Sequence, residues 1–207
     1  ANGVEEVASL DATAAAIESA TRALDVDVTV ISSDTSSDSE LARLLANAGR
    51  GADLVLTTSD HMVVGQQDPV SSVLPRMGGT DFARVAMEPG ANQGFALIDP
   101  SLVPLVVLPA GPGPALISFM VFVQPLLRKL SGLPPADVLR AETDRPIARH
   151  PDSTTFVPVR LARVGGRPVL LRAGMGDVTH AIDLSMADAI AVVGAGDEPV
   201  PTGMPLV

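Results

Sequence analysis

The 207-residue sequence contains no cysteine, tryptophan or tyrosine, and phenylalanine occurs only five times. Without cysteine there can be no disulfide framework, no thiolate nucleophile and no cysteine-ligated zinc site. Because aromatic side chains are scarce, the core has to be built from Val, Leu, Ala and Ile. Hydrophobic residues make up 46% of the chain and charged residues 18%, a composition that predicts a folded protein rather than a disordered one.

Positive charge is also scarce, since 14 Lys and Arg face 24 Asp and Glu and the net charge is -10. This balance argues against nucleic acid as a partner, because a phosphate backbone repels an acidic surface. A small anion held by a local group of backbone N–H donors is still compatible with it. The first ten residues have neither a basic nor an apolar stretch, which argues against a signal peptide.

A hydrophobic run long enough for a membrane helix is missing as well. Residues 102–127 carry no charge, but prolines and glycines interrupt the first half of this stretch. About 13 apolar-rich residues follow, fewer than the roughly 20 that a membrane span needs. The sequence also lacks the GxSxG, Walker, HExxH and GxGxxG motifs, which removes most support for hydrolase, kinase-like and dinucleotide-binding functions.

Helical and strand patterns alternate up to Gly132, which ends the last of the helices. Helices are predicted at 11–24, 40–48, 69–77 and 115–130, and strands at 26–31, 53–58, 82–87, 93–98 and 102–108. This order predicts an α/β domain with a mostly parallel sheet that is covered on both faces. Pro125 is expected to kink the last helix, because proline removes a backbone donor there.

The pattern changes after residue 132. Leu133-Pro134-Pro135 is typical of a linker, and short β-type runs follow at 155–163, 168–172 and 189–193. Gly165-Gly166 lies between the first two of these runs and predicts a hairpin. We therefore expect an α/β domain over residues 1–132 and a small β-barrel-like domain over residues 133–207.

Two polar loops follow predicted strands at the edge of the sheet where ligands commonly bind. In the loop 59–68, Asp60 and Asp68 could hold a cation or orient a polar ligand. Alternatively, Asp68 simply caps the helix that begins at Pro69. In the loop after residue 31, Asp34 and Asp38 could complete a cation site, or Asp38 could cap the next helix.

The loop 109–114, Pro-Ala-Gly-Pro-Gly-Pro, joins a short apolar strand directly to a helix. A helix N-terminus at that place can hold an anion with its unpaired N–H groups. Proline has no N–H, so the donors are limited to Ala110, Gly111, Gly113 and Ala115. The alternative is a stiff connection that packs the helix onto the sheet.

Several segments, in order, resemble the molybdopterin molybdotransferase (MoeA) family, from about residue 52 to residue 132 and more faintly beyond. The resembling segments are DLVLTT at 53–58, VGQQD at 64–68, RVAMEPG at 84–90, LPAGP at 108–112 and QPLLRKLSG at 124–132. The resemblance implies an α/β/α sandwich that inserts molybdenum from molybdate into adenylated molybdopterin, with Mg²⁺. It also implies a cytoplasmic protein that forms a homodimer or pairs with a full-length relative.

The resemblance also carries roles over to single residues. By position Asp68 is an acidic site residue; Asp68 and Asp60 are the predicted catalytic residues, and Asp34 and Asp68 are the predicted metal ligands. The predicted substrate-binding residues are Arg84 in place of a lysine, Pro109, Gly111 and Pro112 of the proline loop, Thr179 in place of a serine, and Arg160.

The sequence departs from the family pattern in three loops. Residues 59–63 replace a Gly-Gly-Val-Ser loop, and Glu88 and Ala91 stand where the family has lysines. Glu88 puts a negative charge where an anionic substrate favours a positive one. Pro158 stands where an arginine is expected, with Arg160 nearby. These changes leave a second hypothesis open, a protein that keeps the scaffold and binds molybdopterin, another anion or a relative without catalysing the reaction.

Overall fold

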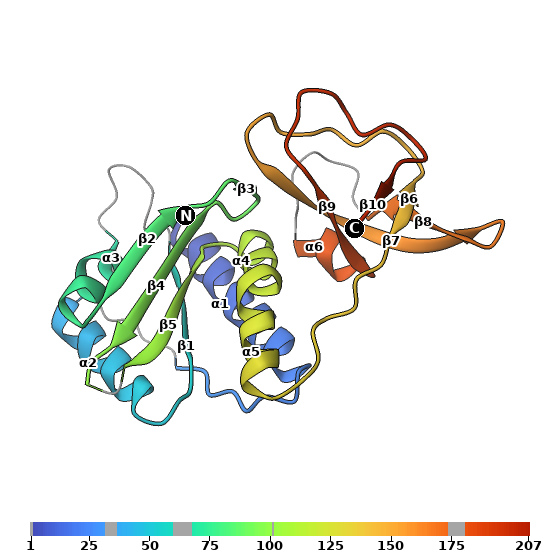
Figure 1. Cartoon of the computed structure of the whole chain (residues 1–207). Coiled ribbons are helices and arrows are strands. Elements are labelled where there is room, and N and C mark those ends of the chain that lie inside the picture. Colours follow the sequence, from blue (N-terminus) through green and yellow to red (C-terminus); the bar gives the residue numbers. More distant parts are fainter. Residues whose placement is uncertain (1, 32–36, 60–67, 101, 174–180) are drawn as a thin grey trace. The chain divides into compact units, whose positions relative to one another are not determined.

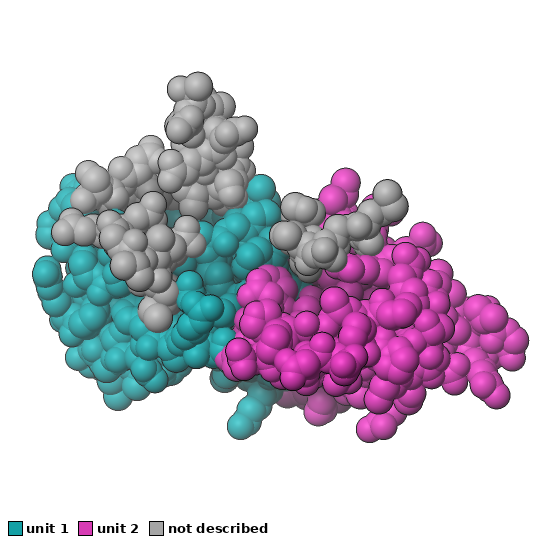
Figure 2. Space-filling model, turned by 90° about the horizontal axis from the view of Figure 1, so that it is seen from above, with its two compact units in different colours: residues 1–85, 90–131 teal, residues 86–89, 132–207 magenta. Residues whose placement is uncertain are grey.

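The computed structural model describes residues 2–31, 37–59, 68–100, 102–173 and 181–207. The chain divides into two compact units, which Figure 2 shows in different colours. Unit 1 comprises Ala1–Val85 and Gly90–Ser131, and unit 2 comprises Ala86–Pro89 and Gly132–Val207. Helices and mixed sheets confirm the predicted α/β class. Within the described ranges, no helix is both long and apolar enough to cross a membrane.

Unit 1 is built on a four-stranded sheet (Figure 1). Its strands run in the order β1 (Val55–Ser59), β5 (Val103–Pro109), β4 (Asn92–Ile98) and β2 (Thr80–Arg84). β1 and β5 are parallel, whereas β5 with β4 and β4 with β2 are antiparallel. The prediction of a mostly parallel sheet is therefore wrong. The connections 85–91 and 99–102 join β2 to β4 and β4 to β5. Neither connection contains, among its described residues, a crossover helix, which neighbouring parallel strands would need, so these strands are antiparallel.

Alternate residues of β5 supply two apolar clusters, one on each face of this sheet. Leu105 and Val107 pack with α2 (Asp38–Gly49) and α3 (Pro69–Val73). The intervening residues Val106 and Leu108 pack with α1 (Asn2–Arg22) and α4 (Pro112–Ser118). In Figure 1, α2 and α3 accordingly lie on the opposite side of the sheet from α1 and α4. A strand covered on both faces reads as a continuous apolar run, which is the sequence pattern at 102–108.

The strand predicted at 26–31 is not formed. Val30 and Ile31 are 48% and 50% exposed, and no described strand pairs with this segment. Its β-branched alternation favours an extended backbone, but a strand also needs a neighbour that accepts and donates its backbone hydrogen bonds. One side-chain bond reaches it, from Nη2 of Arg22 to the carbonyl oxygen of Val28 at 3.3 Å.

The last helix of unit 1 runs from Pro112 to Leu130 but is not uniform. α4 passes into a π-helical turn at Phe119–Val123, and α5 (Gln124–Leu130) follows without a break. Pro125 lies in the first turn of α5, and its ring would clash with the carbonyl of the residue four positions earlier in a regular α-helix. The wider π turn directly before Pro125 avoids that clash. The structure therefore places the predicted irregularity just before the proline.

The predicted helix 69–77 is formed by α3 and a 3₁₀ turn, η1 (Leu74–Arg76).

The N-cap of α2 is Ser37 and not Asp38, so the prediction that Asp38 caps α2 is wrong. Its carboxylate instead points to the next helical segment. Oδ2 of Asp38 accepts a hydrogen bond from Ser72 Oγ at 3.2 Å and lies 3.3 Å from Nη1 of Arg76. The pair is largely exposed, and such pairs contribute little stability.

In its described residues, unit 2 is a curled six-stranded sheet with one short helix, α6 (Ala181–Ser185). Its strands are β3 (Met87–Glu88), β6 (Ala141–Thr143), β7 (Thr154–Val164), β8 (Arg167–Arg172), β9 (Ala189–Val193) and β10 (Pro205–Leu206). The path runs β10-β6-β8-β7-β3, and β9 pairs with β7. The N–H of Val192 in β9 donates to the carbonyl of Val207, just beyond β10, at 2.6 Å. The sheet thus curls until its two sides meet.

The predicted glycine hairpin is confirmed. β7 and β8 are antiparallel, with Val164 opposite Arg167, so Gly165 and Gly166 form the turn. Their φ angles are 57° and 84°, and a two-residue turn with positive φ at both positions matches the twist of the strands. Glycine adopts this conformation without a steric penalty, which is why this pair of residues predicts the turn so well.

Candidate functional site

Asp68 ties the end of β1 to the start of α3. It is the N-cap of α3, and its Oδ2 accepts from the backbone N–H of Ser71 at 2.7 Å. Its Oδ1 accepts from Oγ of Ser59, the last residue of β1. The hydroxyl of Ser71 in turn donates to the carbonyl of Asp68 at 2.9 Å. The capping alternative for Asp68 is thus confirmed, and each carboxylate oxygen already accepts one hydrogen bond.

The parallel pairing of β1 with β5 brings this cap beside the proline loop. Ser59 and Pro109, the final residues of the two strands, are partners in register. The carboxyl ends of β1 and β5 therefore form one edge, with Asp68 held by Ser59 on one strand and the loop 110–111 leaving the other. We refer to this place, consisting of Ser59, Asp68, Pro109, Gly111 and Pro112, as the β1–β5 edge.

Gly111 sets the geometry of the proline loop. Its φ is +86°, and it is the N-cap of α4, with Pro112 at the first helical position. Positive φ favours glycine, and proline is suited to the first turn. The carbonyl of Gly111 accepts from the N–H of Ala115 at 3.1 Å. The amide of Ala115 is therefore already used inside the helix. Of the four predicted anion donors, the amides of Ala110, Gly111 and Gly113 are left as candidates.

The remaining candidate residues are divided between the two units. Arg84 is the last residue of β2 in unit 1, opposite Asn92 in register, and its side chain is exposed. Arg160 is exposed on β7 of unit 2, opposite Leu171. Glu88 is exposed on β3, which also belongs to unit 2. Asp34, Asp60 and Thr179 lie outside the described residues.

Sequence reasoning overlooked three polar residues near the candidate segments. Ser59 is buried and orients Asp68. Gln93 and Ser118 are buried polar partners of each other in unit 1. Of the three, only Ser59 has a usable signal in the sequence, a hydroxyl at the end of a strand that is predicted to be buried. For Gln93 and Ser118, which are 25 residues apart, only the fold brings the two side chains together.

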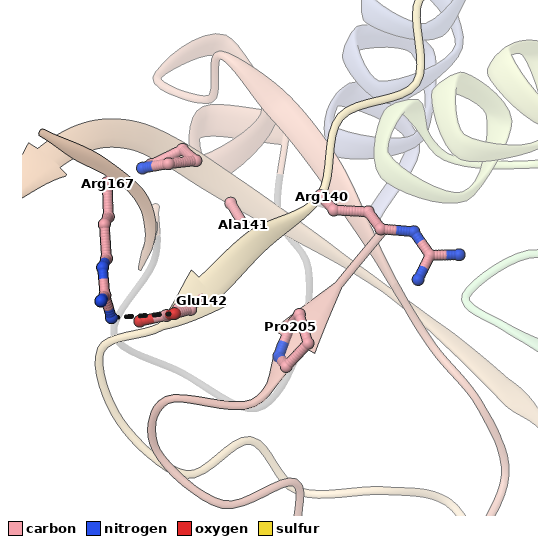
Figure 3. Close-up of a pocket in the computed structure, with 6 residues that line it drawn as sticks. Arg140, Ala141, Glu142, Arg167 and Pro205 are labelled. Atoms are coloured by element: carbon pink, nitrogen blue, oxygen red, sulfur yellow. Dashed lines mark ion pairs between the residues drawn. The ribbon is translucent and has the colours of Figure 1, made fainter.

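A shallow hollow in unit 2 contains none of the candidate residues. It is lined by Arg140, Ala141, Glu142, Arg167, Pro168 and Pro205. Figure 3 shows Arg167 paired with Glu142 at 3.7 Å, with Arg140 turned away from the pair. The side chains of this pair are 76% and 41% exposed, so the interaction is weak. Because none of its lining residues is a candidate residue, the hollow is not part of the candidate site.

The described residues do not by themselves form a metal site. Among them, no three Asp, Glu, His or Cys side chains come together in a cluster that could hold one. At the β1–β5 edge they supply a single carboxylate, that of Asp68, and both of its oxygens already accept hydrogen bonds. Mg²⁺ needs near-octahedral oxygen ligation, so the described part of the edge does not by itself form a magnesium site.

Comparison with known proteins places the chain in a family. Residues 140–205 match the model of the MoeA C-terminal region (domain IV). Molybdopterin molybdenumtransferase 1 of Mycobacterium tuberculosis (strain H37Rv) is 33% identical over 143 residues, which cover 66% of this chain and 34% of that protein. Molybdopterin molybdenumtransferase of Nostoc sp. is 30% identical over 172 residues, 79% of this chain and 38% of that protein.

Solved structures show the same fold. The molybdopterin biosynthesis MoeA protein of Pyrococcus horikoshii OT3 superposes with a TM-score of 0.70 over 93% of this chain and 44% of that chain, at 14% identity. A molybdenum cofactor biosynthesis protein of Pyrococcus furiosus gives a TM-score of 0.60 at 20% identity, over 82% of this chain and 53% of that one. The chain spans roughly a third of the length of the curated relatives. The chain belongs to the MoeA family, and its residues 140–205 match the C-terminal region of that family.

Proposed function

We propose that this chain takes part in molybdenum cofactor biosynthesis, as the C-terminal part of a protein that inserts molybdenum from molybdate into adenylated molybdopterin. The observation that carries the proposal is the 33% identity over 143 residues to molybdopterin molybdenumtransferase 1. The β1–β5 edge supports it, because the carboxyl ends of strands in α/β sheets are the usual place for ligands. The predicted α/β/α sandwich and homodimer belong to the same proposal.

The proposed role of the edge is to hold and orient anions. Both reactants are anionic, and the amides of Gly111 and Gly113 are donors at the start of α4. The guanidinium of Arg84 would supply positive charge from β2. Positioning two reactants against each other can account for a large part of a rate enhancement without any covalent intermediate. We therefore assign binding and orientation to these residues and no proton transfer.

Mg²⁺ enters this proposal only as an expectation from the family. When bound, it would offset the charge of the two anions. The carboxylate of Asp68 is the one candidate ligand at the described part of the edge, and it is already engaged by Ser59 and Ser71. Nothing in the proposed role of the edge therefore depends on the metal.

Glu88 favours a second candidate function, a protein that binds molybdopterin or pairs with a full-length relative without catalysing insertion. The carboxylate of Glu88 is exposed, at a position where the family carries a lysine. An uncompensated negative charge near an anionic ligand weakens binding. The two candidates share the ligand and differ in the reaction.

Isothermal titration of molybdopterin into the purified chain tests the proposal, with inorganic phosphate as the control ligand. Micromolar binding of molybdopterin, with phosphate at least about 100-fold weaker, would support it, and that ratio corresponds to about 2.7 kcal/mol. Conversion of molybdate by the same preparation would then favour the enzyme over the binding protein. A folded chain that binds neither compound would contradict both the enzyme and the molybdopterin-binding protein.

Glu88→Lys is expected to strengthen molybdopterin binding roughly three- to ten-fold at low salt, because it reverses the charge next to an anion. The gain should shrink as ionic strength rises. Titration calorimetry at two salt concentrations measures both effects. Glu198→Lys is the matched control, since it makes the same charge change at an exposed position of unit 2. An equal gain in both variants would attribute the effect to net charge and not to this position.

A further inference from the structure

Residues 85–91, which follow Arg84 at the end of β2 and include Glu88, form a closed loop. The N–H of Val85 donates to the carbonyl of Ala91 at 2.7 Å and so closes its base. Within this loop Ala86–Pro89 belong to unit 2: Met87 pairs with Thr154 of β7, and the N–H of Thr154 donates to the carbonyl of Ala86 at 2.9 Å. The chain therefore leaves unit 1 after Val85 and returns to it at Gly90.

A buried polar pair anchors the point of return. Gln93 of β4 is 9% exposed and Ser118 of α4 is fully buried. Nε2 of Gln93 donates to the carbonyl of Gly90 at 2.6 Å and to Oγ of Ser118 at 2.7 Å. The two N–H bonds of one side-chain amide thus join the loop base to the helix. Buried hydrogen bonds of this kind fix geometry, because an unpaired donor in the interior is costly.

Ser118 also lies on the helix that starts at the proline loop. It is the last residue of α4, whose first residue is Pro112 and whose N-cap is Gly111. A helix is stiff over this length, so a contact at Ser118 relates the loop base at Gly90 to the β1–β5 edge at Gly111. The two segments proposed to contact the ligand in unit 1 are therefore linked through one side-chain amide.

We propose that Gln93 and Ser118 are positioning residues, which hold the loop base at Gly90 in register with the proline loop and so place Arg84 for anion binding. The inference rests on the proposed function. Neither side chain needs to touch the ligand. A hydrophobic residue of the same size could fill the space of Gln93, but it could not bond Gly90 and Ser118 together. Small displacements of a binding group lower affinity and rate steeply.

Ser118→Ala tests the inference, because it removes the helix end of the link and leaves one buried N–H of Gln93 without its acceptor. Gln93→Met tests the same link from the strand and keeps the side-chain length, in case the first variant does not fold. The matched control is Thr21→Val, which removes another buried hydroxyl of unit 1. Oγ1 of Thr21 donates to the carbonyl of Ile17 at 2.8 Å, within α1, so the bond that the control removes is internal to another helix.

Two readouts are measured on the whole chain, hydrogen exchange of the Val85 amide without ligand and the dissociation constant for molybdopterin. We expect Ser118→Ala to accelerate exchange at Val85 at least about ten-fold and to weaken binding roughly five- to thirty-fold. In an Arg84→Ala background the same substitution should change binding by less than about two-fold, since Arg84 is the group being positioned. A general loss of stability would not produce that dependence on Arg84. Thr21→Val should leave both readouts within about two-fold.

The readouts separate failure of this inference from failure of the proposed function. If the unmodified chain binds molybdopterin and Ser118→Ala binds it equally well, the inference is overturned and the function stands. If the unmodified chain does not bind, the proposed function fails and exchange at Val85 decides whether the link exists. Unchanged exchange at Val85 in both Ser118→Ala and Gln93→Met would overturn the link itself.

Discussion

Gly94→Ala is expected to destabilise unit 1 by about 2 kcal/mol, the usual cost of overpacking a core. Gly94 lies at the centre of β4, with Phe82 opposite it on β2 and Val107 opposite it on β5. A Cβ at this position would lie 2.8 Å from two ring carbons of Phe82 and 2.9 Å from Cβ of Val107. Both neighbours would have to move, and Val107 is fully buried. Urea unfolding measures the loss as a change in the midpoint.

Gly51→Ala is the control for this substitution. A Cβ at Gly51 would meet no atom within 4 Å, so its effect should stay within about 0.5 kcal/mol. Adding Phe82→Ala to Gly94→Ala should recover part of the cost, because the ring is one of the two obstacles. A Gly94→Ala protein as stable as the Gly51→Ala protein would contradict the described packing of Phe82 over β4.

Asp68→Ala is expected to cost about 2 kcal/mol, because it removes the N-cap of α3 and leaves Ser59 without its acceptor. Asp68→Asn should cost less than about 0.5 kcal/mol, since asparagine caps helices as well as aspartate does. Its side-chain oxygen can accept from the N–H of Ser71, and its amide can donate to Oγ of Ser59. Thermal and urea unfolding of the two variants measure the capping role separately from the charge.

The same pair of variants tests whether Asp68 lies near the ligand. Asp68→Asn removes a negative charge from the edge proposed to hold an anion, so molybdopterin should bind roughly three-fold more tightly at low salt. Loss of affinity that occurs only with magnesium present would instead assign Asp68 to a cation site. Unchanged affinity under both conditions would restrict Asp68 to capping.

Local patterns in the sequence predicted most elements of unit 1 and the hairpin of unit 2. The continuous apolar run of β5 and the Gly165-Gly166 pair are strong local signals, and both elements formed where they were expected. The run 26–31 has an equally good β pattern but no strand. The difference lies in the neighbours, because a strand depends on pairing that local sequence does not encode.

The direction of the strands was predictable in principle. Three strand patterns follow one another from residue 82 to residue 108 with no helical pattern between them. Parallel neighbours need a crossover of a dozen or more residues, so this order already favours antiparallel pairing. The alternation of helices and strands elsewhere outweighed that signal and led to the wrong prediction of a mostly parallel sheet.

The candidate site was predictable only in part. The position of Asp68 and of the proline loop after two strands suggested a common edge, and the register of Ser59 with Pro109 brings them there. The buried hydrogen bond from Gln93 to Ser118 joins β4 to α4, a contact that no local pattern reveals. Sequence position therefore located the loops but did not identify the side chains that hold them.

Hydrogen exchange of backbone amides with and without molybdopterin tests most directly whether the β1–β5 edge is the ligand site. The account predicts slower exchange at Gly111 and Gly113, the amides at the start of α4, with Gly51 as an amide that should not respond. Protection confined to unit 2, or equal protection at Gly51 and Gly113, would contradict the placement of the ligand at this edge.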